Sequence, residues 1–80
     1  MIDTITQKPL QVTPNERAGP FIIVPYSQLN EVCSLLDAKK VRYEVDEETY
    51  SVDDEPEVIF VNIRRGTEAA MIQELLDSIP

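Results

Sequence analysis

Two short apolar runs constrain the fold of this chain more than any other feature of its sequence. Phe21-Ile22-Ile23-Val24 lies between Pro20 and Pro25, and Val58-Ile59-Phe60-Val61-Asn62-Ile63 follows Glu57. Runs of this length without regular polar alternation are typical of strands that are apolar on both faces of a sheet. We therefore predict that residues 21–24 and 57–63 are the central strands of one sheet.

The remaining periodic segments predict two helices and a further strand. Apolar residues recur at helical spacing in 27–40 and in 67–78, with Ser27 and Thr67 as the predicted N-caps. Residues 41–45 alternate strictly between apolar and polar, which indicates a strand with one wet face. The alternation resumes at 49–52 after Asp46-Glu47-Glu48, and a bend at these acids would join the two pieces. The predicted order is strand, helix, strand, strand, helix.

This order is most of a split β-α-β arrangement, in which 21–24 and 57–63 lie in the middle of the sheet and 41–45 at an edge. It resembles a ferredoxin-like domain that lacks its last strand, over residues 21–79 and on element order alone. The expected fold class is α+β: a two-layer sandwich with a mainly antiparallel sheet and two helices on one face. This kind of fold hosts many unrelated functions, so the resemblance implies no activity.

Residues 1–20 contain three prolines, one glycine and few apolar residues, which favours a flexible N-terminal segment. Residues 21–80 are then the single folded domain. Within the segment, the alternation at 10–13 favours a short edge strand. Such a strand would fill the open edge beside 21–24, and a partner chain is the alternative occupant.

Two helices on one face would leave an apolar face on the other side of the sheet. Phe21 and Ile23 point opposite to Ile22 and Val24, and residues 57–63 divide in the same way. We expect a homodimer that covers the free face. The alternative is a monomer in which the N-terminal segment covers it. The interface candidates are Phe21, Ile23, Ile59 and Val61.

The charge is concentrated in one segment. The chain has 15 acidic and 7 basic residues, a formal net charge of −8, and the window 44–57 holds eight acids without a Lys or Arg. This field repels phosphate backbones and argues against a nucleic-acid partner. A divalent-cation site at Asp46, Glu48, Asp53 and Asp54 is one interpretation of the acidic cluster. A solvated turn is the favoured one, and docking on a basic partner is the third.

A second candidate site is the sequence Arg64-Arg65-Gly66-Thr67 before the last helix, where backbone N–H groups and guanidinium groups are suited to an anion. Lys39, Lys40 and Arg42 would add to the same positive end of the sheet. The alternative is ordinary helix capping, with the basic residues paired to the acids of 44–57.

The chain has few of the residue types that commonly act in catalysis. The chain has no histidine and a single cysteine, Cys33, on the apolar stripe of the first helix, where core packing is expected. The three tyrosines are likewise expected to pack, and no cofactor is predicted. The N-terminus lacks the pattern of a signal peptide, no run is long enough to cross a membrane, and we expect a cytoplasmic location.

The function expected from these patterns is a small non-enzymatic interaction or regulatory module that acts as a homodimer. The alternative is a sensor domain for a small ligand or anion that uses Arg64, Arg65, Gly66 and Thr67. A carboxylate-dependent enzyme ranks last.

Overall fold

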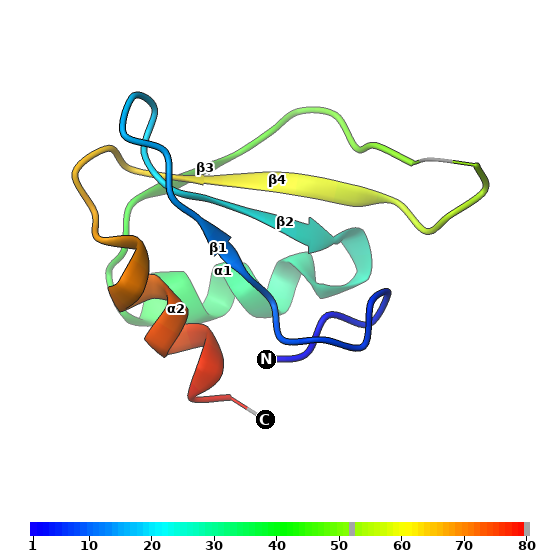
Figure 1. Cartoon of the computed structure of the whole chain (residues 1–80), viewed down its shortest axis with the longest axis horizontal. Coiled ribbons are helices and arrows are strands. Elements are labelled where there is room, and N and C mark those ends of the chain that lie inside the picture. Colours follow the sequence, from blue (N-terminus) through cyan, green and yellow to red (C-terminus); the bar gives the residue numbers. More distant parts are fainter. Residues whose placement is uncertain (52, 80) are drawn as a thin grey trace.

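The computed structural model describes residues 1–51 and 53–79, which form a four-stranded sheet and two helices. The strands are β1 (Val12–Thr13), β2 (Phe21–Pro25), β3 (Tyr43–Val45) and β4 (Val58–Ile63). Helix α1 (Leu29–Ala38) follows a 3-10 turn, η1 (Tyr26–Gln28), and α2 (Ala69–Asp77) ends the fold (Figure 1).

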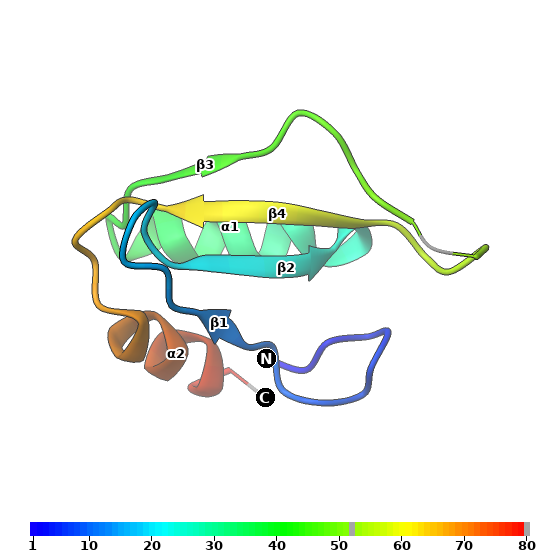
Figure 2. The ribbon, with the colours of Figure 1, turned by 45° about the horizontal axis from the view of Figure 1, so that its top comes forward.

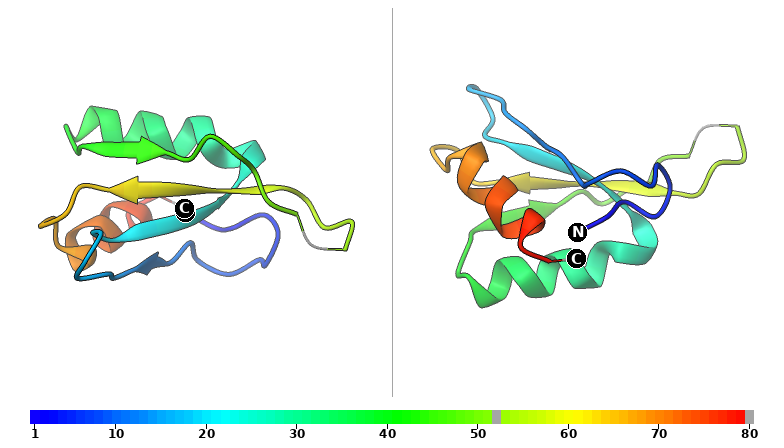
Figure 3. Two further views of the ribbon diagram at one scale, coloured as in Figure 1. Left: turned by 90° about the horizontal axis from the view of Figure 1, so that it is seen from above. Right: turned by 60° about the horizontal axis from the view of Figure 1, so that its bottom comes forward.

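The α+β class is confirmed. All neighbouring strands are antiparallel in the order β1-β2-β4-β3, so the two apolar runs are central and β3 lies at an edge. Figures 2 and 3 show both helices on one side of the sheet. The edge beside β2 is occupied by β1, where Val12 pairs with Ile22 and Thr13 with Phe21. The short edge strand expected within 10–13 is therefore present.

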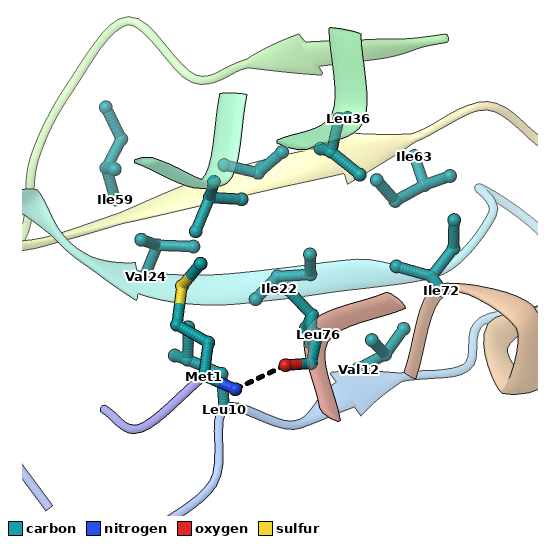
Figure 4. Packing of buried hydrophobic residues seen from close by; sticks show 12 residues of the cluster. Met1, Leu10, Val12, Ile22, Val24, Leu36, Ile59, Ile63, Ile72 and Leu76 are labelled. Atoms are coloured by element: carbon teal, nitrogen blue, oxygen red, sulfur yellow. Dashed lines mark hydrogen bonds between the residues drawn. The ribbon is translucent and has the colours of Figure 1, made fainter. Parts of the chain in front are cut away.

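The register decides which side of each central strand meets the helices. Ile22 pairs with Val61 and Val24 with Ile59, and all four are buried. They belong to a core that also takes residues from both helices, from β1 and from the N-terminus (Figure 4): Met1, Leu10, Val12, Ile22, Val24, Val32, Leu36, Ile59, Val61, Ile63, Ile72 and Leu76. Ile59 and Val61 are thus wrong as interface candidates, because they face the helices.

The N-terminal segment is part of this folded unit. Met1 and Leu10 are 5% and 1% exposed, and the Met1 nitrogen donates to the carbonyl oxygens of Leu76 (Figure 4) and Ile79. The buried Gln28 side chain donates to the Ile2 carbonyl at 2.7 Å and accepts from the Thr4 N–H at 3.0 Å. These contacts attach the first residues of the chain to η1 and to the end of α2, where the sequence favoured a flexible segment over 1–20.

One side chain of helix α2 forms hydrogen bonds with backbone groups at the outer edge of β1. The Gln73 amide accepts from the Val12 N–H and donates to the Leu10 carbonyl, both at 2.9 Å. One side chain therefore satisfies two backbone groups that a neighbouring strand would otherwise pair. This edge of the sheet is consequently satisfied within the chain.

The element ends differ from the sequence expectations. Ser27 lies inside η1, the N-cap of α1 is Gln28, and that of α2 is Glu68 instead of Thr67. Helix α1 stops at Ala38 because Lys40 adopts a left-handed conformation (φ 57°), with Val41 donating to the Leu36 carbonyl at 2.9 Å. In place of a strand over 49–52, Tyr50 makes a single bridge to Val58, and Val52 lies outside the described residues.

Candidate functional site

The sheet face opposite the helices carries an exposed apolar cluster, which we call the outer patch. Its members alternate with the buried residues of β2 and β4 and include one residue of the β3–β4 connection. The Phe21 and Phe60 rings stack at 5.5 Å between centroids, and Tyr50 meets Phe60 edge-on at 5.6 Å. Ile23, the cross-strand partner of Phe60, is 43% exposed and Tyr50 is 49% exposed. The outer patch consists of Phe21, Ile23, Tyr50, Val58 and Phe60.

The structure therefore keeps two of the four interface candidates, Phe21 and Ile23, on the outer side of the sheet. Val58 and Phe60 take the places assigned to Ile59 and Val61, since strand alternation and the Ile23–Phe60 pairing put them on this face. The N-terminal segment runs along the β2 edge and packs against α2, and its Ile5 lines a hollow of about 210 Å³ with Tyr50 and Val58. The segment therefore reaches one end of the outer patch and leaves Ile23 exposed.

The cationic residues gather at one end of the sheet. The start of β3 and the end of β4 meet there, and the Arg64 N–H donates to the Arg42 carbonyl at 3.0 Å. A hollow of about 260 Å³ lies between the α1–β3 and β4–α2 connections. Its lining residues are Lys39, Lys40, Val41, Arg42, Arg64, Thr67 and Met71. The expected contribution of Lys39, Lys40 and Arg42 to the positive end is present, and we call these three residues with Arg64 the basic end.

The four residues of the predicted anion site do not all line one hollow. Arg64 and Thr67 line the hollow just described. Arg64 and Arg65 line a larger, open depression of about 750 Å³ that also contains Asp37 and Glu44, and Gly66 and Thr67 line a third hollow with Glu16. Of these three hollows, the first is lined by basic, apolar and hydroxyl side chains and the other two include carboxylates, so an anion site at this end uses the lysines and Arg42 together with Arg64 in the first hollow.

The acidic residues of the β3–β4 connection lie at the opposite end. The connection 46–57 joins the end of β3 to the start of β4 and extends beyond the sheet, away from the basic end (Figure 1). Asp46 accepts from the Asn62 amide at 2.6 Å, Glu48 is exposed, and Asp53 and Asp54 are exposed in left-handed turn conformations. We call 46–57 the acidic hairpin. Glu44, which belongs to the same acidic window of the sequence, instead lines one open depression with Arg42, Arg64 and Arg65, so pairing of basic residues with acids of 44–57 stays an alternative for Glu44.

The acidic hairpin does not assemble the predicted metal site. Within residues 1–51 and 53–79, no three Asp, Glu or Cys side chains gather closely enough to hold a metal ion. The proposed set of Asp46, Glu48, Asp53 and Asp54 is therefore not brought together, because Asp46 is held against β4 and the others lie along the loop.

One titratable group beside the basic end is strongly perturbed. The Tyr43 hydroxyl donates to the Asp37 carboxylate at 2.8 Å and lies next to the half-buried Cys33. Burial, followed by these two neighbours, raises the pKa of Tyr43 well above its ordinary value near 10. Its hydroxyl therefore keeps its proton and fixes β3 to α1. Of the tyrosines expected to pack, Tyr26 and Tyr50 are instead about half exposed, at 52% and 49%.

In the part of the chain that the structure describes, neither helix has the length and apolar character needed to cross a bilayer. Comparison of the chain with protein-family models, with curated proteins and with solved structures found no match.

Proposed function

We propose that the protein is a small non-enzymatic interaction module that works as a homodimer, with the outer patch as its contact surface. The exposed aromatic and aliphatic cluster on β2 and β4 carries this proposal. Isolated exposed apolar residues are common on monomers, but a contiguous group with stacked rings on a flat sheet face is typical of a protein contact surface. The non-enzymatic role and the cytoplasmic location remain predictions from the sequence.

Two features favour this surface over the sheet edges. Helix α2 already satisfies the outer edge of β1 through Gln73. At the other edge β3 is only three residues long and exposes Glu44, which disfavours pairing with a second strand. The outer face is therefore the part of the sheet best suited to a partner.

The proposal predicts that Ile23→Lys dissociates the dimer and leaves the fold intact, because the added charge would be buried between two copies. Sedimentation equilibrium should show the mass falling from twice 9.1 kDa to 9.1 kDa, with unchanged far-ultraviolet circular dichroism. Ile2→Lys is the matched control, because Ile2 is also 43% exposed but lies in the N-terminal segment, where its carbonyl is bonded to Gln28, and it should leave the dimer unchanged.

A wild-type protein that stays at 9.1 kDa throughout a concentration series would overturn the homodimer. Equal dissociation by Ile23→Lys and Ile2→Lys would instead show that the outer patch is not the contact.

A second candidate function is the binding of a small anion in the hollow at the basic end. The observation that favours it is the convergence of Lys39, Lys40, Arg42 and Arg64 on one space of about 260 Å³, in a chain with a strongly negative net charge. Phosphate groups suit such a set, because Arg and Lys give charge-assisted hydrogen bonds to phosphate oxygens.

Titration with inorganic phosphate, followed by amide chemical shifts, tests this candidate. Shifts should centre on 39–42 and 64–67 and be lost in Arg64→Ala, whereas Arg17→Ala, on the β1–β2 connection, should keep them. Shifts that survive Arg64→Ala, or that are spread over the surface, would exclude a site in this hollow.

A further inference from the structure

We infer that the two copies pair face to face with their strands antiparallel, so that the acidic hairpin of each lies over the basic end of the other. This inference rests on the proposed homodimer and deepens it, because it names the orientation and the second contact. It follows from the way charge and apolar surface are ordered along one face of the sheet.

Three zones succeed one another along the outer face. At one end, Arg42 and Arg64 continue β3 and β4 on adjacent positions. The outer patch occupies the middle, where Ile23 pairs with Phe60. At the other end, β4 begins directly after the acidic hairpin. Along β4 the face therefore runs from basic through apolar to acidic, and on the neighbouring segment Glu44, opposite Asn62, and Asp46, bonded to Asn62, are two further acids between the basic end and the outer patch.

Symmetry restricts how two such faces meet. A homodimer uses the same surface on both copies, related by a two-fold axis. Sheets that pack face to face keep their strands within about 30° of alignment or cross them at about 90°, and the aligned class allows two orientations here. An axis parallel to the strands would place each basic end over its own counterpart and hairpin over hairpin. An axis across the strands instead places opposite charges together at both ends of the interface.

The dimensions agree with the second arrangement. At about 3.3 Å per strand residue, Arg64 lies about 13 Å from Phe60 in one direction along β4, and Glu57 lies about 10 Å from it in the other. A two-fold axis near Phe60 therefore brings each hairpin opposite the basic end of its partner. Face-to-face sheets lie about 10 Å apart, a gap that long Lys, Arg and Glu side chains can span from both sides.

The experiment compares two charge-reversal variants that change the net charge equally. Glu48→Lys/Glu55→Lys alters exposed positions in the acidic hairpin, and Glu31→Lys/Glu74→Lys alters exposed positions on the helices. Both reduce the repulsion between two negatively charged copies. We expect the helix variant to dimerise at least as tightly as the wild type, and the hairpin variant about tenfold more weakly, because its new lysines would face the partner's basic end.

A mixing experiment completes the test. Arg42→Glu/Arg64→Glu should also weaken self-association, because it sets carboxylates against the partner's hairpin. Mixed with the hairpin variant, it should form a heterodimer, resolved by native mass spectrometry, in which both ends of the interface again join opposite charges. Circular dichroism checks that each variant is folded.

The outcomes separate the two proposals. If the hairpin variant dimerises as tightly as the helix variant while Ile23→Lys still dissociates the protein, the antiparallel orientation is overturned and the homodimer stands. A monomeric wild type overturns both.

Discussion

Two glycines share a left-handed backbone conformation but differ in how closely other atoms approach them. Gly19 and Gly66 both have positive φ, 93° and 95°. A Cβ at Gly19 would lie 2.5 Å from the Ile63 carbonyl oxygen and 2.8 Å from the Arg65 nitrogen, whereas one at Gly66 would have open space. Gly19 therefore lets the β1–β2 connection lie directly against the end of β4, at the base of the basic end.

This contrast gives a prediction with a built-in control. Gly66→Ala should lower the free energy of unfolding by about 1 kcal/mol, the cost of a left-handed alanine. Gly19→Ala should cost roughly 1–3 kcal/mol more, because rigid backbone must move. Urea unfolding measures both values, and equal costs would refute the close approach at Gly19.

The Tyr43 hydroxyl predicts a pH dependence. Its pKa is raised in the folded state, so the unfolded chain loses this proton first as the pH rises past about 10. The stability linked to the neutral hydroxyl is thus complete below that pH and is lost above it. Urea unfolding between about pH 8 and pH 11 should show a steeper decline for the wild type than for Tyr43→Phe. Identical slopes would contradict the perturbation.

At the scale of elements, periodicity determined what the sequence could predict. The helices and the apolar strands were predictable because their patterns repeat within a few residues. In the N-terminal segment only the strand within 10–13 was predictable, from the alternation of Leu10 and Val12. Burial of Met1 was not, because Met1 belongs to no periodic pattern and its partners lie in α2, far along the chain. The division of β4 into core and outer patch depended on the Ile23–Phe60 register, which no local pattern specifies.

The candidate site was predictable to the same degree. Lys39, Lys40 and Arg42 precede β3 and Arg64 follows β4, so antiparallel pairing of these two strands brings the four residues together. This clustering could be predicted from the sequence. The carboxylates near this end depend on contacts between elements, because β3 brings Glu44 to the depression lined by Arg64 and Arg65, and the β1–β2 connection brings Glu16 to the hollow lined by Gly66 and Thr67.

The place of the N-terminal segment in the core is open to direct measurement. Leu10→Ala should lower the free energy of unfolding by about 2–5 kcal/mol, because it leaves a cavity between β2 and α2. Ile2→Ala, at a position 43% exposed, should cost less than about 0.5 kcal/mol. If Leu10→Ala lowers the free energy of unfolding as little as Ile2→Ala does, Leu10 is not part of the core.

At the scale of the whole molecule, the small core and the exposed apolar face both bear on the stability of the native state. A chain of 80 residues buries a modest share of its surface, so the proposed association would add appreciably to the stability of the native state. On that proposal the midpoint of thermal unfolding should rise with protein concentration for the wild type and for Ile2→Lys, but stay constant for Ile23→Lys. Calorimetry over a hundredfold concentration range is the measurement, and a constant midpoint in the wild type would contradict the dimer.

The Gln73 contact also sets a limit on how far the sheet can be extended. Stacks of strands that grow without end need two open edges on every unit, one to receive the preceding unit and one to offer to the next. Here one edge terminates in a helix side chain that already holds the Val12 N–H and the Leu10 carbonyl. Among the described strands, β3 is then the edge left to accept a strand from outside, so backbone pairing between copies would stop after a single addition.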